Sequence, residues 1–536
     1  MARLPQEAPR RRDARPCHHQ FASWHLGGME RSVALLVTPI VFEDDHVLVV
    51  NKPAGMNTHA PAPFAGEGIY EWLKNREPRW ANLAIIHRLD KETSGILLFG
   101  KISEANRSLT EQFATRRVRK TYQLRTDRKV ARKEFTVQSI IAREGDRYIS
   151  MAGGEHAETR FRVIGSEGGI TIMEAEPVTG RTHQIRVHAA ENGFPIIGDT
   201  LYGGTPADRE LLHAERLTIK HPITGKELTL EAPADFAIER SRGLREAIID
   251  PQETNAFRVI HGASDGWPGW YVDRLGDYQS ARLKGFECRG AYHKLLSRHA
   301  REESPAHVFG DAAPEFFPIR ENGIQFELSF QQGYSTGVFL DQRDNRRRLF
   351  THYVAPDFVL PERPVVLNTF AYTCAFSVCA AKGGAKVTSV DLSKKYLDWG
   401  RRNFAVNGLD PKEHDFIYGD VFGWLRRLWK KGRRFDLIIL DPPTFSHSKE
   451  WGAFQAQMDY SKLVAAALPM LNPNGVLFAA TNAATWKPEE FLAVLESAIK
   501  HSDRSIAQHH FSPQPPDFPV TREEPAYLKS FWLRVR

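Results

Sequence analysis

"LAIIHRLDKETSGILLFGK", residues 83–101, places one acid, Asp90, in a polar loop between two apolar runs. The runs at 83–86 and 95–99 are rich in Ile and Leu and predict two short buried strands, and the Thr, Ser and Gly between them are turn formers. The acid is therefore expected at the edge of a sheet. A lone Asp in a loop most often bonds its own backbone, so a chemical role depends on what the rest of the chain places beside it.

The length and composition predict several folded domains. At 536 residues the chain is too long for one hydrophobic core, so two or three domains are expected. A hydrophobic content of 42% with 26% charged residues is typical of folded, soluble domains. The stretch "SVALLVTPIVF" (32–42) is interrupted by Pro39 and is too short for a membrane span, which needs about 20 residues, so it predicts a first strand. Met29 is an alternative start of the chain, which mass spectrometry of the native protein would test.

Cysteine usage and charge indicate an intracellular protein with a polyanionic partner. The chain has four scattered cysteines and no CxxC pair, which predicts neither a disulfide framework nor a zinc site, and we expect no metal and a cytoplasmic location. The formal net charge of +7 and a pI near 9.1 suit nucleic acid, although many basic proteins bind none.

The pattern along the chain divides it into four regions. Residues 1–38 form a basic arm, for which disorder is one interpretation. Residues 39–240 are rich in short strands and turns. Residues 250–350 predict a small α+β middle domain with a connector. From 356 to 536, strands and helices alternate, which is typical of a parallel sheet. The fold class expected is therefore multidomain, with α/β and α+β parts.

Four further stretches, together with "HRLDKETSGILL", resemble the RluA-type pseudouridine synthases over about 39–235. They follow in the family's order: "VFEDDHVLVVNKPAGMNTH" (41–59), "RKTYQL" (119–124), "TGRTHQIRVHAAENGFPIIGDTLYGG" (179–204) and "LLHAERL" (211–217), the last matching a closing helix. The resemblance implies a mixed-sheet domain that detaches uracil from ribose in RNA, rotates it and reattaches it through carbon, without metal or cofactor.

The resemblance assigns catalytic roles to four residues. Asp90 matches the family's catalytic Asp, which acts as nucleophile or charge stabiliser. Arg186 matches the family's Arg, whose charge keeps an acid ionised. Tyr122 matches the Tyr that stacks on the base and moves a proton, and Leu212 an apolar residue of the pocket.

Taken singly, these residues also have ordinary structural explanations. Tyr122 could be a strand aromatic, and Arg186 with His188 could form one exposed strand face. His183 could be an ordinary polar residue. The ordered combination with Asp90 favours the synthase.

The last third of the chain predicts a parallel sheet that binds a ligand with a ribose, as nucleotide cofactors have. A strand at 365–367 and a strand at 387–390 precede Asp391, which follows Asn368 by 23 residues and suits a ribose hydroxyl of either NAD or S-adenosylmethionine (SAM). No GxGxxG is present, which weakens the NAD interpretation. In "FDLIILDPPTFSHSK", a buried strand at 437–440 delivers Asp441 to its carboxyl end, where ligands bind in open α/β sheets. A plain rigid turn is the alternative.

From about 250 to the end, the chain resembles the RlmI and RlmK type of large-subunit ribosomal RNA methyltransferases. "AFRVIHGASDGWPGWYVDRLGD" resembles their middle domain and "GYSTGVFLDQRDNRRRL" (333–349) the start of their Rossmann-like class I SAM domain. SAM is therefore the implied cofactor. The residues implied to hold SAM are Asn368, Phe370 and Tyr372 at the methionine half, Asp391 at the ribose, Asp420 at the adenine and Asp441 at the methyl end. Those implied to face the acceptor base are Asp441, Pro442, Pro443 and Phe445. Gln342, Arg343 and Arg346 are expected to line SAM or RNA, with a solvated helix face as the alternative.

Two departures from this family bear on the methyl acceptor. Cys374 stands where the family has Gly, in the turn nearest SAM, and is expected to crowd it. In "LFAATNAATW" (477–486), Thr481 and Asn482 stand where the cytosine-C5 enzymes carry a Cys. An unactivated ring carbon needs that thiolate, whereas a ring nitrogen attacks the methyl group directly. The sequence therefore favours a guanine ring nitrogen over cytosine C5.

The function predicted is a fusion of two RNA-modifying enzymes acting on rRNA or tRNA. No small RNA-binding module precedes the methyltransferase part, so we hypothesise that the synthase helps to dock the RNA. One alternative is a synthase with a degenerate methyltransferase domain that serves as an RNA-binding or ribosome-assembly module. Another is a dehydrogenase-like second half that binds NAD. SAM binding by calorimetry would discriminate among these.

Overall fold

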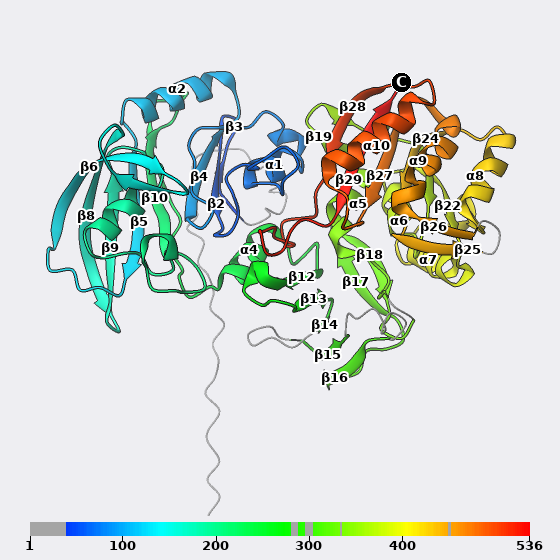
Figure 1. Cartoon of the computed structure of the whole chain (residues 1–536), viewed down its shortest axis with the longest axis horizontal. Coiled ribbons are helices and arrows are strands. Elements are labelled where there is room, and N and C mark those ends of the chain that lie inside the picture. The colour runs from blue at the N-terminus through cyan, green and yellow to red at the C-terminus, as the bar shows by residue number, and fades with distance from the viewer. Residues whose placement is uncertain (1–38, 280–287, 295–303, 333–334, 449–451) are drawn as a thin grey trace, which may run out of the picture. The chain divides into compact units, whose positions relative to one another are not determined.

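The computed structural model describes residues 39–279, 288–294, 304–332, 335–448 and 452–536 (Figure 1). The predicted basic arm at 1–38, with Met29, lies outside the described residues, as does most of the predicted strand at 32–42. The 3₁₀ segments are η1 (Pro78–Trp80), η2 (Thr200–Tyr202), η3 (Gly262–Asp265), η4 (Leu340–Gln342), η5 (Pro411–Glu413) and η6 (Leu468–Met470).

The first half of the described chain forms an eleven-stranded mixed sheet in the order β1-β2-β4-β10-β5-β9-β8-β6-β7, with β3 paired to β4 and β11 to β10. Its strands are β1 (Ile40–Glu43), β2 (Val47–Lys52), β3 (Ala84–Ile85), β4 (Ser94–Gly100), β5 (Arg119–Thr126), β6 (Glu134–Glu144), β7 (Arg147–Ser150), β8 (Glu155–Glu167), β9 (Ile170–Pro177), β10 (Leu212–Lys220) and β11 (Glu227–Glu231). Its helices are α1 (Ile69–Lys74), α2 (Ser103–Ala114) and α3 (Gln184–Glu191). The pairing of β10 with β4 is parallel, so these two strands bring segments distant in sequence side by side.

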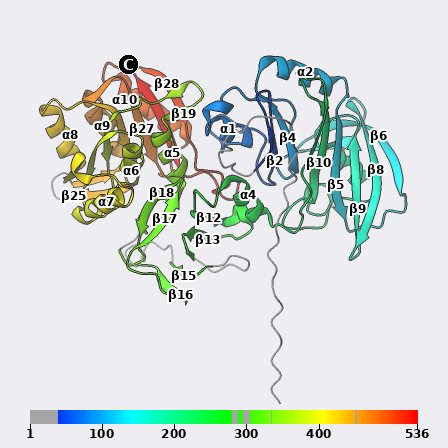
Figure 2. The ribbon, with the colours of Figure 1, turned by 180° about the vertical axis from the view of Figure 1, so that it is seen from behind.

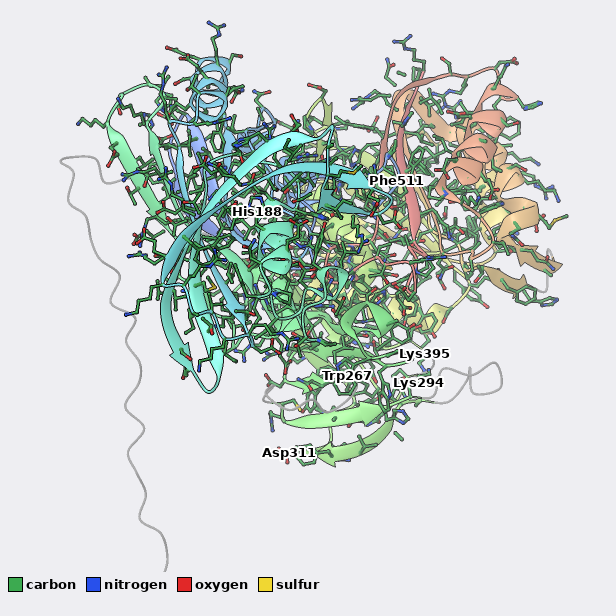
Figure 3. The ribbon with its side chains drawn as sticks, turned by 60° about the vertical axis from the view of Figure 1, so that its left-hand side comes forward. His188, Trp267, Lys294, Asp311, Lys395 and Phe511 are labelled. Atoms are coloured by element: carbon green, nitrogen blue, oxygen red, sulfur yellow. The ribbon has the colours of Figure 1, made fainter. Side chains whose placement is uncertain are left out.

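Two local expectations for this half were wrong. The segment 211–217, predicted as a closing helix, is the strand β10, which pairs with β4, β5 and β11. Its Leu, Ala and Glu are helix formers, and pairing on both sides overrides that preference. The alternative in which Arg186 and His188 share a strand face also fails, because both lie on α3 (His188 is labelled in Figure 3).

A smaller β-rich segment follows. Helix α4 (Arg240–Ile248) leads into a five-stranded sheet in sequential order, and a hairpin comes after it. The sheet strands are β12 (Ala256–His261), β13 (Tyr271–Leu275), β14 (Tyr278–Gln279), β15 (Gly290–His293) and β16 (Ala306–Gly310), and the hairpin strands are β17 (Phe317–Glu321) and β18 (Ile324–Leu328).

The last part is a seven-stranded sheet in the order β23-β22-β21-β24-β27-β29-β28. Figure 2 shows this part of the chain, coloured from yellow to red, from behind. The first five of these strands run parallel, and β29 is antiparallel to both of its neighbours. The sheet strands are β21 (Val365–Thr369), β22 (Lys386–Asp391), β23 (Asp415–Tyr418), β24 (Phe435–Leu440), β27 (Leu471–Thr481), β28 (Ile506–Phe511) and β29 (Lys529–Val535). Two small hairpins lie outside it: β19 (Tyr353–Ala355) with β20 (Phe358–Val359), and β25 (Phe445–Ser448) with β26 (Gly452–Gln455). The helices are α5 (Arg343–Thr351), α6 (Ala375–Lys382), α7 (Lys394–Val406), α8 (Val421–Lys430), α9 (Ala456–Ala467) and α10 (Pro488–Lys500).

Both faces of this parallel sheet are buried, as its continuous apolar strands require. Val366 and Ile439 belong to one hydrophobic cluster, whereas Leu367 and Ile438 belong to the cluster on the opposite face. The strand order reverses at β21, between β22 and β24. A reversal of this kind opens a crevice at the carboxyl ends of the strands, which is where ligands bind. The predicted α/β class is confirmed.

Candidate active sites

The Asp90 loop, between β3 and β4, is held by hydrogen bonds on both sides. Thr58 Oγ1 donates to the Leu89 carbonyl at 2.9 Å and accepts from the Leu89 amide at 3.1 Å. On the other side Lys52 Nζ, fully buried, donates to the carbonyls of Met56 at 2.7 Å and Lys91 at 3.1 Å. Burial lowers the pKa of Lys52 to about 7. The carboxylate is thus carried on a fixed backbone, which a catalytic group requires.

Helix α3 brings two side chains to this carboxylate. Arg186 Nη1 lies 3.4 Å from Asp90 Oδ2, and His183 Nε2 lies 3.7 Å from the same oxygen. His183 Nδ1 shares a hydrogen bond of 2.9 Å with the hydroxyl of Tyr202. His183 is the N-cap of α3 and has a φ of 57°, a left-handed conformation that aims its ring at the loop. Burial lowers the pKa of His183, which favours its neutral form.

Arg186 is shared among three acids. Its closest contacts are to Asp199, through two hydrogen bonds of 2.8 Å from Nε and Nη2, and Nε lies 3.2 Å from Glu210 Oε2. Burial opposes the charge of Arg186, but Asp199, Glu210 and Asp90 together raise its pKa well above the ordinary value. Burial raises the pKa of Glu210 to about 8. The guanidinium is therefore fixed by Asp199 and offers Asp90 one remaining amino group.

The four residues predicted for the synthase line one cavity of about 900 Å³: Asp90, Tyr122, Arg186 and Leu212. Burial, and then the charge of Asp90, raise the pKa of Tyr122, so its hydroxyl keeps its proton at neutral pH. Leu212 is 3% exposed and belongs to the cluster of buried apolar residues beneath this wall. A dry wall, a phenol and a carboxylate on one cavity suit the binding and rearrangement of a flipped base.

Sequence reasoning missed several residues of this site: Lys52, Asp199, Tyr202 and Glu210. The dipeptide Gly-Asp within "PIIGDTLYGG" was visible, but nothing in the sequence indicates that Asp199 holds Arg186. His183 had been considered an ordinary polar residue, and the structure places it beside Asp90.

At the second site, the turn after β21 is conformationally unusual. Phe370, Tyr372 and Cys374 have φ values of 53°, 49° and 63°, so three residues with side chains adopt the left-handed region within five positions. Such conformations cost free energy and concentrate at functional sites. Asp391, at the end of β22, holds this turn, since its Oδ2 accepts from the Tyr372 amide at 2.8 Å. Asn368 is buried and donates to Ser377 Oγ on α6 at 2.9 Å.

Asp441 follows β24 at the crevice and accepts a hydrogen bond of 3.2 Å from Gln342. Burial, and then the charge of Asp341, raise the pKa of Asp441 to about 7. Asp341 Oδ1 is itself buried without a hydrogen-bond partner among the described residues. Pro442 is buried, whereas Pro443 and Phe445 are exposed, with 59% of Phe445 accessible.

The remaining predicted residues of this region have different surroundings. Asp420 is the N-cap of α8, and its Oδ1 accepts from the Gly423 amide at 3.0 Å. Arg343 and Arg346 are neither on a solvated face nor free to line a ligand: both are buried in ion pairs, Arg343 with Asp517 at 2.6 Å and Arg346 with Glu321 at 2.7 Å. The prediction that these two line SAM or RNA was wrong, because burial obliges each guanidinium to have an acid partner.

Cys374, which was expected to crowd the turn nearest SAM, packs into the hydrophobic core. It is fully buried, it is the N-cap of α6, and its side chain packs against Gly400 of α7. Burial raises the pKa of Cys374 to about 12, so the thiol is unreactive.

The residues of the crevice fit SAM, which carries positive charge on its sulfonium and amino groups. Asp341 and Asp441 are two neighbouring, partly buried acids with one buried, unpartnered oxygen among the described residues, and a cationic ligand would offset their charge. Asp391 has one accepted hydrogen bond on each oxygen, which leaves acceptor capacity for hydroxyl groups.

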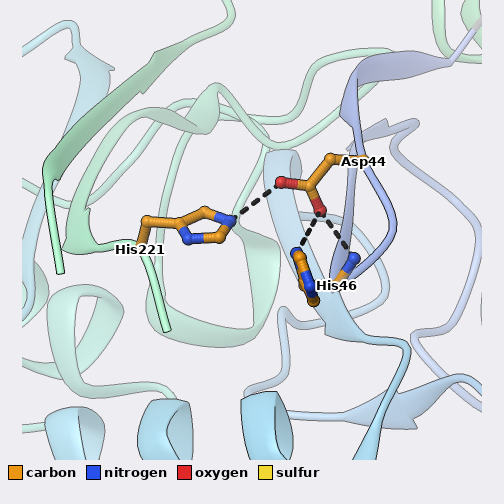
Figure 4. A group of neighbouring side chains, drawn as sticks. All are labelled: Asp44, His46 and His221. Atoms are coloured by element: carbon orange, nitrogen blue, oxygen red, sulfur yellow. Dashed lines mark hydrogen bonds and ion pairs between the residues drawn. The ribbon is translucent and has the colours of Figure 1, made fainter. Parts of the chain in front are cut away.

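A third cluster, Asp44, His46 and His221, combines residue types that bind metals (Figure 4). His221 Nδ1 accepts from the Thr224 amide at 3.1 Å, so Nε2 carries the proton that it donates to Asp44 Oδ2 at 2.8 Å. Asp44 Oδ1 accepts from the amides of His46 and Val47. Asp44 and His221 therefore use these acceptor atoms within the protein, and the cluster ties the β1–β2 turn to the end of β10.

Within the described residues, no helix combines the length and apolar character needed to cross a membrane.

These two sites define a chain that joins a pseudouridine synthase domain to a SAM-dependent methyltransferase domain. The RNA pseudouridylate synthase family model matches residues 46–191, and the S-adenosylmethionine-dependent methyltransferase model matches residues 281–534.

The chain belongs to the family of ribosomal RNA large-subunit methyltransferases. It is similar to a ribosomal RNA large subunit methyltransferase of Deinococcus radiodurans (34% identity, 60% of this chain, 83% of the relative). It is also similar to ribosomal RNA large subunit methyltransferase I of Klebsiella pneumoniae (30% identity, 69% of this chain, 93% of the relative). Among solved structures, human RNA pseudouridylate synthase domain containing 1 aligns with 25% identity, a TM-score of 0.32, and coverage of 37% of this chain and 84% of that one. The recognition of both families from the sequence, and of SAM as the cofactor, is confirmed.

Proposed function

We propose that this chain is bifunctional, isomerising uridine to pseudouridine and methylating a base of the same class of RNA, with ribosomal RNA as the substrate. The observation that carries the first activity is that Asp90, Tyr122 and Arg186 line one cavity. The names of the curated relatives support ribosomal RNA for the second activity, and transfer RNA is the alternative. The proposed domains are 39–240, 250–350 and 356–536, preceded by a basic arm at 1–38.

In the proposed isomerisation, Asp90 stabilises or attacks the ribose carbon as the bond to N1 of uracil breaks. Arg186 holds the carboxylate in place through one amino group while Asp199 holds Arg186. Tyr122 stacks on the detached base. As carbon 5 bonds to the ribose it releases its proton to water, and N1, whose bond to the ribose has broken, takes up a proton. The Tyr122 hydroxyl, which keeps its proton at neutral pH, is available as the donor and is reprotonated from water. Leu212 keeps that wall apolar, so the charged intermediate is shielded from water.

For the methyltransferase, SAM supplies an electrophilic methyl group. Asp391 is proposed to bind its ribose and Asp441 to lie at the methyl end, with Asn368, Phe370 and Tyr372 at the methionine half and Asp420 near the adenine. Pro443 and Phe445 form the face presented to the acceptor base, and the buried Pro442 fixes the backbone beneath it. The exposed Phe445 ring supports this, because it can stack on a base.

The proposed acceptor is a guanine ring nitrogen. Of the cysteines in the described residues, Cys374 and Cys379 are buried, and burial raises the pKa of both thiols, which leaves neither as a thiolate for attack on cytosine C6. Thr481, at the place of the cysteine in the C5 enzymes, is 1% exposed.

Mapping of pseudouridines and methylated bases in total RNA, with and without the gene, tests both activities. Asp90→Ala should abolish only the pseudouridine, and Asp441→Ala only the methyl mark. A variant with Cys288, Cys374 and Cys379 replaced by Ser should still methylate; loss of methylation in a folded, SAM-binding variant would indicate C5 chemistry. Calorimetry that shows no heat on titration with SAM would favour the assembly-module alternative.

A further inference from the structure

Lys120 is a cation on the cavity wall for which the catalytic arrangement above has no use. It lies on β5 two residues before Tyr122, so the two side chains point to the same side of the strand, and both line the cavity. A methyl group placed on Gly180 would lie 3.5 Å from Lys120 Nζ, which places the ammonium beside the turn between β9 and α3. The ammonium is therefore at the same opening as the catalytic carboxylate.

No acid and no hydrogen-bond acceptor among the described residues pairs with this ammonium. Lys120 is partly buried, and burial alone lowers its pKa to about 8, with no acid offsetting it. His87 also lines the cavity; its ring stacks on Phe113 at 4.9 Å and its Nε2 accepts from the Leu98 amide at 3.1 Å. Burial, and then the charge of Lys120, lower the pKa of His87 to about 3, so this neighbour is neutral.

The other cations of the cavity differ from Lys120. Arg88 and Arg116 are exposed. Arg181 pairs with Glu155 at 2.8 Å. Burial lowers the pKa of Lys91, but the charge of Glu92 offsets part of this, whereas no acid does so for Lys120. Arg186 is saturated by its three acids, as described above. Lys120 is thus a partly desolvated charge for which the described part of the chain supplies no partner, and a buried charge is costly unless it is paired.

We infer that Lys120 binds a phosphate group of the RNA backbone next to the uridine in the cavity, and so positions the flipped nucleotide over Asp90. This rests on the proposed function of the synthase domain. Phosphate is the anionic group that RNA offers at neutral pH, and a lysine binds it as a point charge. The turn at Gly180 leaves room beside the ammonium, since a glycine there brings no side chain towards it.

The test uses the full-length protein and short rRNA fragments that contain the mapped uridine. In one fragment after another, a single phosphate is replaced by an uncharged methylphosphonate. Binding is measured by equilibrium titration and isomerisation by single-turnover kinetics. Lys120→Met should weaken binding roughly tenfold to hundredfold, the worth of a hydrogen bond to a charged group, with little change of rate at saturating RNA. At one position, replacing the phosphate by methylphosphonate should weaken RNA binding by the wild type to a similar extent and should not change RNA binding by Lys120→Met. Lys120→Arg should restore that sensitivity.

Lys133→Met, which removes an exposed lysine outside the cavity, is the matched control and should bind as the wild type does. The inference is overturned if Lys120→Met and every methylphosphonate act additively, or if Lys120→Met lowers only the saturating rate, which would indicate a role in proton transfer. A wild type that forms no pseudouridine would refute the proposed function instead. The binding titrations, made on the tightest-binding fragment, would still decide the role of Lys120.

Discussion

Cys374 and Gly400 form a matched pair in the methyltransferase domain, and exchanging them predicts a measurable coupling. A methyl group added to Gly400 would overlap Cys374 Sγ and lie 2.9 Å from its Cβ, closer than real Cβ contacts allow. Overpacking of this kind costs about 1–3 kcal/mol, which exceeds the roughly 1 kcal/mol that Ala gains over Gly in a helix. Gly400→Ala alone is therefore expected to destabilise the domain.

Replacing Cys374 by Gly removes both atoms with which the new methyl group would clash and leaves the Thr373 carbonyl at an ordinary contact distance of 3.5 Å. It also relieves the left-handed conformation at a φ of 63°, which costs a residue with a Cβ about 1–2 kcal/mol. The loss of the buried thiol offsets part of this gain. The two substitutions should therefore be coupled. The double variant Cys374→Gly/Gly400→Ala should be about 1–3 kcal/mol more stable than the sum of the two single effects predicts.

Equilibrium urea unfolding of the wild type, the two single variants and the double variant measures this coupling. Calorimetry with SAM shows whether the turn still binds the cofactor. Gly165→Ala, whose added methyl group would meet no atom within 4 Å, controls for the introduction of Ala and should be close to neutral. Equal destabilisation by Gly400→Ala with and without Cys374 would refute the packing argument. So would stronger SAM binding by Cys374→Gly alone with no change of stability, since it would mean that the thiol crowds the crevice.

Three further expectations concern buried charges. Asp199→Asn should slow isomerisation at saturating RNA roughly tenfold or more, because Arg186 loses the charged contact that aims it at Asp90; an unchanged rate would contradict this. Burial raises the pKa of Asp441 to about 7, so the folded protein holds this proton more tightly than the unfolded chain does. The resulting stabilisation is complete below the ordinary pKa of 3.8 and is lost as the pH rises through about 7. Asp441→Asn does not titrate, so it should gain stability relative to the wild type between about pH 4 and pH 7 in thermal unfolding scans. Lys52 has a lowered pKa and is neutral in the folded protein above about 7, so the stability of the wild type relative to Lys52→Met should rise from pH 7 towards pH 10; a flat difference would exclude the burial argument.

How far the sequence could predict the synthase site depends on how its residues are held. Asp90, Tyr122 and Leu212 come from strands or from the loop between two strands whose motifs are visible along the chain, and all three line the cavity. Glu210 and Lys52 could not be found this way. Their importance comes from burial and from contacts with distant parts of the chain, and a sequence contains neither. Lys52 bonds to a carbonyl 39 residues away, and Glu210 to Thr93, which is 117 residues away.

The same division holds for the second domain. The strands at 365–367, 387–390 and 437–440 were predicted because a buried parallel strand is a continuous apolar run, and they form β21, β22 and β24. Charged runs were harder to interpret. "DQRDNRRRL" has the composition of a solvated helix, yet Arg343 and Arg346 are buried because Asp517 and Glu321 lie opposite them.

The sequence by itself determined the two enzyme families, the parallel sheet and the residues carried by local motifs, because periodicity and motif spacing are properties of neighbouring residues. Only the tertiary structure decided that 211–217 is a strand, that Cys374 points into the core, and that Arg186 is shared among three acids. The physical reason is the same in each case. Strand pairing, burial and ion pairing depend on which distant segments meet, and the free energies of those contacts exceed the local preferences that a sequence displays.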